Sequence, residues 1–153
     1  MDQDCEICRI IRDSRDDVII VETDYWRVVL NPNQAYPGTA WVTARSHVGS
    51  LSELSEGQWL DLREVMKHYE GAMGRAFGAK LCNWVCLMND AFKEAQPMPH
   101  VHWHVRPRYD SSVKVAGEEL GDPNFAHHYL PKFERALAPS MLREIAERIR
   151  ENW

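Results

Sequence analysis

Three histidines stand at intervals of two residues in the segment PHVHWHVRPRY: His100, His102 and His104. The residues between them are apolar. On a β-strand, a period of two places all three imidazoles on one face and the apolar side chains on the other. A purely structural row of buried imidazoles would leave unpaired nitrogen atoms, which cost free energy to desolvate. The pattern therefore favours chemistry over packing.

Two kinds of chemistry fit this row of histidines. Paired histidines on one strand are common ligands of zinc or iron. Alternatively, one imidazole is a nucleophile in phosphoryl transfer, and its neighbours orient it or donate hydrogen bonds to phosphate oxygens. The spacing alone does not separate a metal site from a phosphoryl-transfer site.

The four cysteines form two pairs of different character. Cys5 and Cys8 stand in a C-x-x-C arrangement, which in a reducing compartment indicates metal binding or redox chemistry. The alternative is that these two thiols stay reduced and bind nothing. Cys82 and Cys86 lie in an apolar run that is typical of a buried strand, so we expect them to serve core packing.

The strands that must position these residues follow from short β-branched and aromatic runs. Five such runs are predicted as strands, at residues 18–22, 25–31, 39–45, 81–88 and 101–106. Only Thr23 and Asp24 separate the first two, which indicates a hairpin, and the prolines and asparagines that follow require a turn before the third. We therefore expect an antiparallel meander.

Two helices are also predicted. Ser55 and Gln58 match a capping box, an apolar stripe of helical spacing follows, and Gly78 is placed to end the helix. We interpret the stripe as a core face; it consists of Trp59, Leu62, Met66, Tyr69, Met73 and Phe77. Beyond Tyr109 a Gly- and Pro-containing stretch leads to a short amphipathic helix with Ser140 as its cap.

The composition sets the outer limits of the function. With 153 residues, 44% hydrophobic and 27% charged, the chain fits one compact domain. A net charge of −5 and the lack of a long Lys/Arg run argue against a protein that holds nucleic acid. No segment approaches the roughly 20 apolar residues of a membrane span, and the polar start lacks the apolar core of a signal peptide. We therefore expect a cytoplasmic location.

The residues around the histidines resemble a known family. The His-x-His-x-His run, with Asn89 and Gln96 upstream, is similar to the histidine triad (HIT) motif of nucleotide hydrolases and transferases. The resemblance extends to the segments CEICRII, LNPNQAYPG and RSHVGSLSEL, and it covers the chain from Cys5 to Tyr109.

This resemblance implies an α+β fold, in which an antiparallel sheet of about five strands is covered by one long helix and followed by a C-terminal helix. Residues 1–110 would form the HIT domain, and residues 111–153 a C-terminal extension packed on the same domain. The resemblance also implies a homodimer, formed through the long helix and a neighbouring strand, and a small-molecule nucleotide as the partner.

By the same resemblance, His102 is the nucleophile that attacks the α-phosphate. A neutral imidazole attacks only if its lone pair faces phosphorus, so its other ring nitrogen must donate its proton to a fixed acceptor. In the family, this acceptor is the backbone carbonyl of the first triad histidine, here His100. His104 matches the histidine that contacts phosphate oxygens.

Five further residues match substrate contacts of the family. Asn89 and Gln96 match polar residues near the phosphate, Asn31 matches the residue that holds the ribose hydroxyls, and Val29 and Leu30 lie near the apolar base pocket. Two alternatives stay open. In the first, Asn31, which precedes a proline, only shapes its loop and does not bind the ribose. In the second, Gln96 is an ordinary exposed loop residue.

The resemblance also gives the cysteine pair a role. Some bacterial and archaeal members use such a pair with two histidines to hold structural zinc, and the ligands here would be Cys5, Cys8, His47 and His100. A closed four-ligand site would brace the N-terminus against the triad strand, and catalysis would need no cofactor.

The implied reaction is like that of a diadenosine polyphosphate hydrolase, with dinucleoside polyphosphates or phosphoramidates as substrates and a nucleotidyl-histidine intermediate. Two departures concern the leaving group: Pro97 replaces a common Ser or Thr, and Ala95 replaces a glycine. The alternatives are a nucleotidyl transferase or phosphorylase of the same family, a weakly active nucleotide-binding protein, and a metal-dependent hydrolase.

Overall fold

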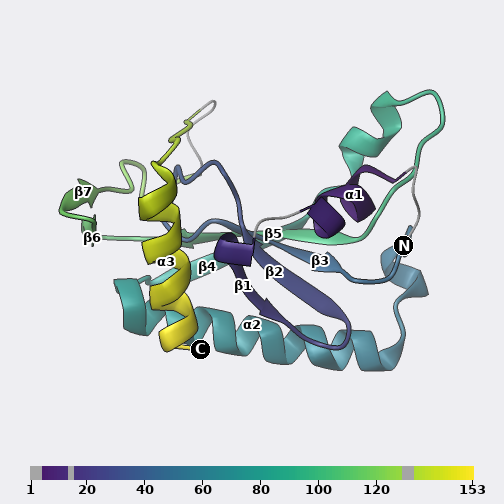
Figure 1. Cartoon of the computed structure of the whole chain (residues 1–153), viewed down its shortest axis with the longest axis horizontal. Helices are drawn as coiled ribbons and strands as arrows, with labels where there is room; N and C mark the ends of the chain where they lie inside the picture. Colours follow the sequence, from purple (N-terminus) through teal and green to yellow (C-terminus); the bar gives the residue numbers. More distant parts are fainter. Residues whose placement is uncertain (1–4, 14–15, 129–132) are drawn as a thin grey trace.

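A five-stranded antiparallel sheet forms the centre of the molecule (Figure 1). The computed structural model describes residues 5–13, 16–128 and 133–153. In spatial order the strands are β1 (Ile19–Glu22), β2 (Trp26–Leu30), β3 (Ala40–Ala44), β5 (His102–Arg108) and β4 (Leu81–Cys86). All neighbouring pairs are antiparallel. The expected α+β fold is confirmed, including the meander of the first three strands.

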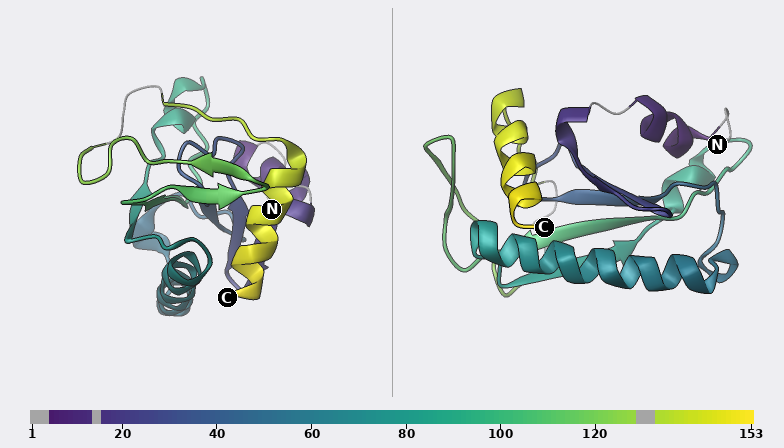
Figure 2. Two further views of the ribbon diagram at one scale, coloured as in Figure 1. Left: turned by 90° about the vertical axis from the view of Figure 1, so that its left-hand side faces the viewer. Right: turned by 60° about the horizontal axis from the view of Figure 1, so that its bottom comes forward.

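Helices cover both faces of this sheet, as Figure 2 shows. The long helix α2 (Glu56–Phe77) runs along one face, and the short helix α1 (Glu6–Asp13) lies over the other. A short 3₁₀ helix, η1 (Asp16–Val18), lies between α1 and β1, and another, η2 (Leu51–Glu53), lies between β3 and α2. In the described part of the chain, no helix is both long and apolar enough to cross a membrane.

The strand register sorts the side chains between the two faces. Val28, Val42 and Trp103 are directly paired across three strands and lie in or against the core. Because side chains alternate along a strand, the neighbouring His102 and His104 point to the opposite face, toward α1. The two histidines of β5 therefore lie outside the main core.

Helix α2 carries both of the end signals predicted from the sequence. The backbone N–H of Gln58 donates to the Ser55 hydroxyl, the backbone N–H of Ser55 donates to Oε1 of Gln58, and Gly78 ends the helix at a φ of 73°. The apolar stripe packs in or against the core except at Trp59, whose side chain is 41% exposed. The prediction that Trp59 belongs to the core face is wrong, because the neighbouring Gln58 is buried instead. The backbone carbonyl of Gln58 accepts a hydrogen bond from Nε1 of Trp26.

Helix α1 was not among the predicted elements. It has only eight residues, and only Cys8 and Ile11 are buried, so its apolar period covers a single turn. So short a helix is marginal by itself and depends on contacts with the rest of the fold.

Strand β4 lies at the edge of the sheet, and its side chains are partly buried or exposed. The expectation of a buried strand is therefore wrong, because Cys82 and Cys86 are only partly buried. Both do pack against the core, as expected. An edge strand has a neighbouring strand on one side only, which leaves its apolar residues incompletely packed. After β4, the 3₁₀ helix η3 (Asn89–Lys93) begins the loop that leads to β5.

Beyond residue 110, the described residues include a hairpin and a helix. The hairpin consists of β6 (Val113–Val115) and β7 (Glu118–Leu120). Its three-residue strands are too short to give a visible alternation in the sequence. Between them Ala116 and Gly117 both have positive φ, as a two-residue hairpin turn requires.

The C-terminal helix α3 (Pro139–Glu151) packs against α2 and β1. It buries Ile145 and Ile149 completely, as its predicted apolar face requires. The predicted cap at Ser140 is wrong, because Ala138 is the cap residue and the helix starts at Pro139. Proline suits this first position, since the N–H that it lacks has no partner within the helix there.

Candidate active site and metal centre

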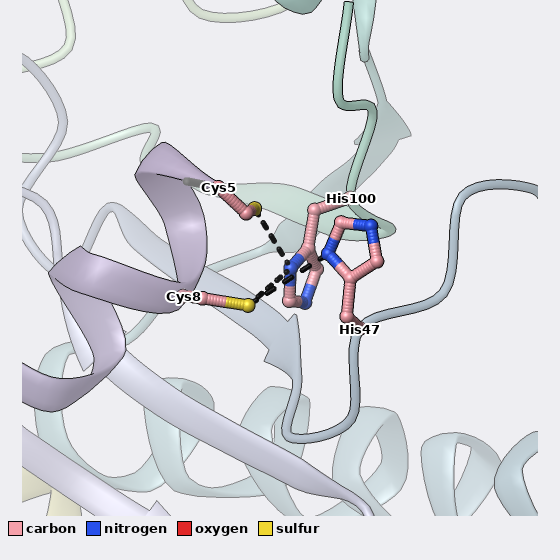
Figure 3. Close-up of side chains that lie close together, drawn as sticks. All are labelled: Cys5, Cys8, His47 and His100. Carbon is pink, nitrogen blue, oxygen red and sulfur yellow. Dashed lines mark hydrogen bonds between the residues drawn. The ribbon is translucent and has the colours of Figure 1, made fainter. Parts of the chain in front are cut away.

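Two cysteines and two histidines that are far apart in the sequence converge beside α1 (Figure 3). Cys5 immediately precedes α1, Cys8 lies in its first turn, His47 lies in the loop after β3, and His100 lies two residues before β5. One ligand atom from each residue lies within 4.8 Å of the other three. The four residues that the sequence resemblance named are therefore brought together.

The distances suit a tetrahedral zinc ion. Sγ of Cys8 lies 3.4 Å from Nδ1 of His100 and 3.7 Å from Nδ1 of His47, and Sγ of Cys5 lies 3.5 Å from Nδ1 of His100. Zinc bonds of about 2.3 Å to sulfur and about 2.0 Å to nitrogen, at tetrahedral angles, separate sulfur from nitrogen by about 3.5 Å. Four protein ligands close such a site, so a metal here would support structure.

The ring of His100 is oriented by its second nitrogen. Nε2 lies 2.7 Å from the carbonyl oxygen of Ala44, which can only accept, so Nε2 carries the proton and Nδ1 presents its lone pair to the sulfur atoms. Burial lowers the pKa of His100 to about 4, which favours the neutral ring that metal binding requires.

The backbone of His100 in turn orients His102. Nδ1 of His102 lies 2.8 Å from the carbonyl oxygen of His100. Because the carbonyl can only accept, Nδ1 carries the proton, and Nε2 of the neutral ring has the lone pair. This hydrogen bond is the one that the resemblance implied. The arrangement gives Nε2 a fixed direction, as a nucleophile needs.

His104 lies two residues further along β5. The centroids of its ring and the His102 ring are 5.1 Å apart. The pKa of His104 is lowered to about 4, mainly by burial and to a smaller extent by His102 and Arg106. The carboxylate of Asp90 opposes this shift only in part. The ring is therefore uncharged at neutral pH and has one N–H to donate. The pKa of Asp90 is lowered mainly by Lys93 and to a smaller extent by His102 and His104, so η3 lies close enough to influence the site.

The loop between β4 and β5 carries the two residues expected near the phosphate. Asn89 is the first residue of η3, directly before Asp90, and Gln96 lies between η3 and β5. Both are exposed, so a ligand can reach their side chains. Pro97 follows Gln96 and has no hydroxyl to contact a leaving group.

The loop at residues 31–38 is ordered by its own side chains. Oδ1 of Asn31 accepts from the backbone of Asn33 at 2.8 Å, so this side chain does shape the turn, as one interpretation held. Its amide nitrogen has two N–H groups that a hydroxyl can accept. Nε2 of the buried Gln34 donates to the carbonyls of Asn31 and Thr39, and so ties the two ends of the loop together.

A cavity of about 510 Å³ lies between α1 and the sheet. Its lining combines charged residues of α1 with apolar residues of the sheet, and consists of Glu6, Arg9, Ile10, Asp13, Val18, Val29, Leu30, Pro32 and Trp41. Val29 and Leu30 were both expected near a nucleobase. Leu30 also belongs to the core cluster, whereas Val29 faces the cavity side of the sheet.

Trp41 connects this cavity to the histidines. It is directly paired with Val29 on β2 and with His104 on β5, so the three side chains form one row on the face toward α1. Trp41 was not among the expected site residues. The alternation of its strand offered a signal, because Ala40 and Val42 face the core and the residue between them must face the other side.

Comparisons with known proteins identify the family to which this sequence is similar. The HIT domain model matches residues 12–111. Adenosine 5′-monophosphoramidase from Saccharomyces cerevisiae is 26% identical over 110 residues, which cover 72% of this chain and 66% of the yeast protein, just under two thirds of its length.

Two solved structures have the same fold. A Hit-like protein from Bartonella henselae has a TM-score of 0.70 at 18% identity, and the match covers 100% of this chain and 98% of that one. A Zn-bound histidine triad family protein from Mycobacterium smegmatis has a TM-score of 0.61 at 17% identity, over 97% of this chain and 92% of that one.

We expect the purified protein to contain about one zinc ion per chain. The Cys5→Ser/Cys8→Ser double variant should lose the metal and unfold at a lower temperature, because the bound ion would tie α1 to the chain around β5. Elemental analysis and thermal unfolding measure the two effects. The matched control is Cys82→Ser/Cys86→Ser on β4, which should keep its metal. Zinc content near zero in wild-type protein grown with adequate zinc would contradict the prediction.

Proposed function

The chain belongs to the HIT family, and we propose that it is a nucleotide hydrolase that cleaves nucleotide conjugates at the α-phosphate through a nucleotidyl-histidine intermediate on His102. The observation that carries this proposal is the hydrogen bond from Nδ1 of His102 to the carbonyl of His100, since it leaves Nε2 with a lone pair of fixed direction. Similarity to a phosphoramidase supports a reaction at phosphorus.

In the first step, Nε2 of His102 attacks the α-phosphorus. The N–P bond forms while the bond to the leaving group breaks, and the leaving group departs with that electron pair. The substituted ring becomes positively charged, and the carbonyl of His100 stabilises it by accepting the hydrogen bond from Nδ1. His104 donates its N–H to a phosphate oxygen, where negative charge is concentrated.

In the second step, water attacks the same phosphorus. The water oxygen forms the new P–O bond, the electron pair of the N–P bond returns to Nε2 of His102, and one proton of the water passes to solvent. The products are a mononucleotide and the leaving group released earlier. If inorganic phosphate replaced water, the product would be a nucleoside diphosphate, which would mark a phosphorylase instead.

We propose dinucleoside polyphosphates or nucleoside phosphoramidates as the substrate class. A polyphosphate leaves as a stable anion, whereas an amine must take up a proton as it leaves. Pro97 has no proton to give, so that proton would come from solvent. The exposed Asn89 and Gln96 are the side chains that we propose to contact the phosphates.

We propose that the nucleobase occupies the cavity between α1 and the sheet, with the ribose at Asn31. The volume of about 510 Å³ lies in the range of small-molecule sites. Val29 and Trp41 offer an apolar surface, and Trp41 adjoins His104 in the strand register. Base stacking on an aromatic side chain is favourable for any base.

The metal has a structural role in this proposal, and catalysis needs no cofactor. A bound zinc ion would hold α1, which supplies one wall of the cavity. Because the ligands must be reduced thiolates, the cluster also supports our proposal of a cytoplasmic location. We further propose that residues 1–110 carry the reaction and that residues 111–153 are an extension packed on the same domain.

We propose that two copies of the chain associate through β4 and α2. Among the residues that the structure describes, no strand pairs with the outer edge of β4, and the exposed Leu81 and Leu87 lie at its start and just after its end. On α2, Trp59 and Leu60 are also exposed. An edge strand flanked by exposed apolar residues is a surface that a second copy can cover.

We predict that His102→Asn abolishes turnover of adenosine 5′-phosphoramidate, because the nucleophile is removed. Binding of AMP should change by no more than about threefold, since the base and ribose contacts remain. Chromatography of the products and calorimetry measure the two quantities. His68→Asn, on the exposed face of α2, is the control and should keep full activity. Wild-type turnover in His102→Asn would remove the proposed mechanism.

Trp41→Leu should weaken AMP binding about tenfold, because stacking of one base is worth about 1–3 kcal/mol. Binding of ribose 5-phosphate, which has no base, should not change. Trp41→Phe should retain most of the affinity. As the control, Trp153→Leu removes a tryptophan that packs on Tyr69, away from the cavity. Equal weakening of both ligands would show that Trp41 supports the fold instead of the base.

In analytical ultracentrifugation, the wild-type protein should sediment at about twice the chain mass of 17.8 kDa. Leu81→Lys/Leu87→Lys should shift it to the monomer, because two charges would be buried at the paired edge. Glu147→Lys changes the charge at another exposed site, on α3, which packs against β1 at the opposite edge of the sheet, and should leave the dimer intact. A monomeric wild-type protein would exclude the proposed interface.

A further inference from the structure

The loop that we propose to hold the ribose is contacted by a segment from far along the chain, residues 133–136, which we call the strap. Asn33 and Ala136 form an isolated antiparallel bridge. The backbone N–H of Gln34 donates to the carbonyl of Arg135 at 2.8 Å, and the backbone N–H of Arg135 donates to Oδ1 of Asn33 at 3.0 Å. The strap therefore pairs with the loop along its backbone.

The side chain of Arg135 adds two hydrogen bonds to different parts of the molecule. Nη1 donates to the carbonyl of Ala35 in the loop, and Nη2 donates to the carbonyl of Gly121, both at 3.2 Å. Gly121 precedes Asp122, whose buried carboxylate pairs with Arg108 at the end of β5 at 2.6 Å. Arg135 thus links the loop to the strand that carries His102 and His104.

This link reaches the residue that would face the ribose. The backbone N–H of Arg135 donates to Oδ1 of Asn33, and the backbone N–H of Asn33 donates to Oδ1 of Asn31. A shift of Asn33 would therefore move the carboxamide of Asn31. Phe133 of the strap also packs edge-to-face on Tyr36 of the loop, with ring centroids 5.8 Å apart.

We propose that Arg135 is a positioning residue for the nucleotide. Its guanidinium group holds the strap on the loop through the carbonyls of Ala35 and Gly121. This keeps the backbone N–H of Arg135 on Oδ1 of Asn33, and Asn33 in turn fixes Asn31 relative to His102, so that the ribose and the α-phosphate are presented together. This inference rests on the proposed function, because it takes the loop as the ribose site. It gives a role to a segment that lies outside residues 12–111, the part matched by the HIT domain model.

The test compares AMP with 2′,3′-dideoxy-AMP, which lacks the ribose hydroxyls, by calorimetry. We expect the wild-type protein to bind AMP about tenfold more tightly, the worth of one to two hydrogen bonds. Arg135→Ala should narrow this preference to about twofold, mainly by weakening AMP, because a loosened Asn31 no longer meets the hydroxyls. The KM for adenosine 5′-phosphoramidate should rise about tenfold, within the range that a displaced binding group causes.

Arg148→Ala is the matched control. Arg148 also lies in the C-terminal region and donates to two backbone carbonyls, those of Lys114 and Ala76, both at 2.7 Å, but it does not contact the loop. This variant should lower the melting temperature and keep the full preference for AMP. A second pair of variants changes Asn33, the loop residue that accepts the hydrogen bond from the strap. Asn33→Ala should lose the preference for AMP, whereas Asn33→Asp, which keeps an oxygen that accepts this bond, should retain it.

The outcomes separate the two proposals. A wild-type protein without preference for AMP would overturn the ribose site, and this inference with it. A preference that persists in both Arg135→Ala and Asn33→Ala would overturn the positioning role alone. If Arg135→Ala does not fold, the two Asn33 variants decide: loss in Asn33→Ala with retention in Asn33→Asp supports the role, and any other result overturns it.

Discussion

Three hydrogen-bonding groups of His100 connect the two parts of the site. Its carbonyl accepts from Nδ1 of His102, its Nε2 donates to the carbonyl of Ala44 in β3, and its Nδ1 faces the sulfur atoms of Cys5 and Cys8. A rotation of this residue that moved Nδ1 away from the two sulfur atoms would also move the carbonyl that orients His102, the proposed nucleophile. The cysteine and histidine group and His102 therefore cannot move independently, and α1, β3 and β5 are held together where they meet His100.

The strand register carries this constraint outward from His100. Val29, Trp41 and His104 form one row across three strands, and adjacent strands lie about 4.8 Å apart. The row spans about 10 Å, so on the function proposed above one nucleotide can touch both ends of it. The cavity wall opposite this row belongs to α1, which begins at the cysteines of the cluster. The group of two cysteines and two histidines is thus linked to the cavity through α1.

Much of this arrangement could be predicted from the sequence because it is encoded locally. The histidine spacing, the strand alternation and the capping box at Ser55 each depend on residues a few positions apart. The rest depends on partners that a local pattern does not contain. Trp59 is exposed because the neighbouring Gln58 takes the buried position. There the backbone carbonyl of Gln58 accepts a hydrogen bond from Nε1 of Trp26, which lies 32 residues away in the sequence. The alternation of β3 indicates which face Trp41 lies on, but its place between Val29 and His104 appears only when the register between β2, β3 and β5 is known.

The strap was hidden from sequence reasoning for a related reason. Much of its contact with the loop is made by backbone groups, such as the N–H of Gln34 and the carbonyl of Arg135, which almost any residue supplies. The two sides of the proposed site differ in how firmly they are held. The loop at residues 31–38 is tied from within and by the strap, whereas Asn89 and Gln96 stand exposed on the loop before β5. On the proposed function, the rigid side meets the nucleotide and the exposed side meets the leaving group. Preorganised contacts discriminate more sharply than exposed ones, so this enzyme should be selective for the nucleotide and tolerant of what is attached to it.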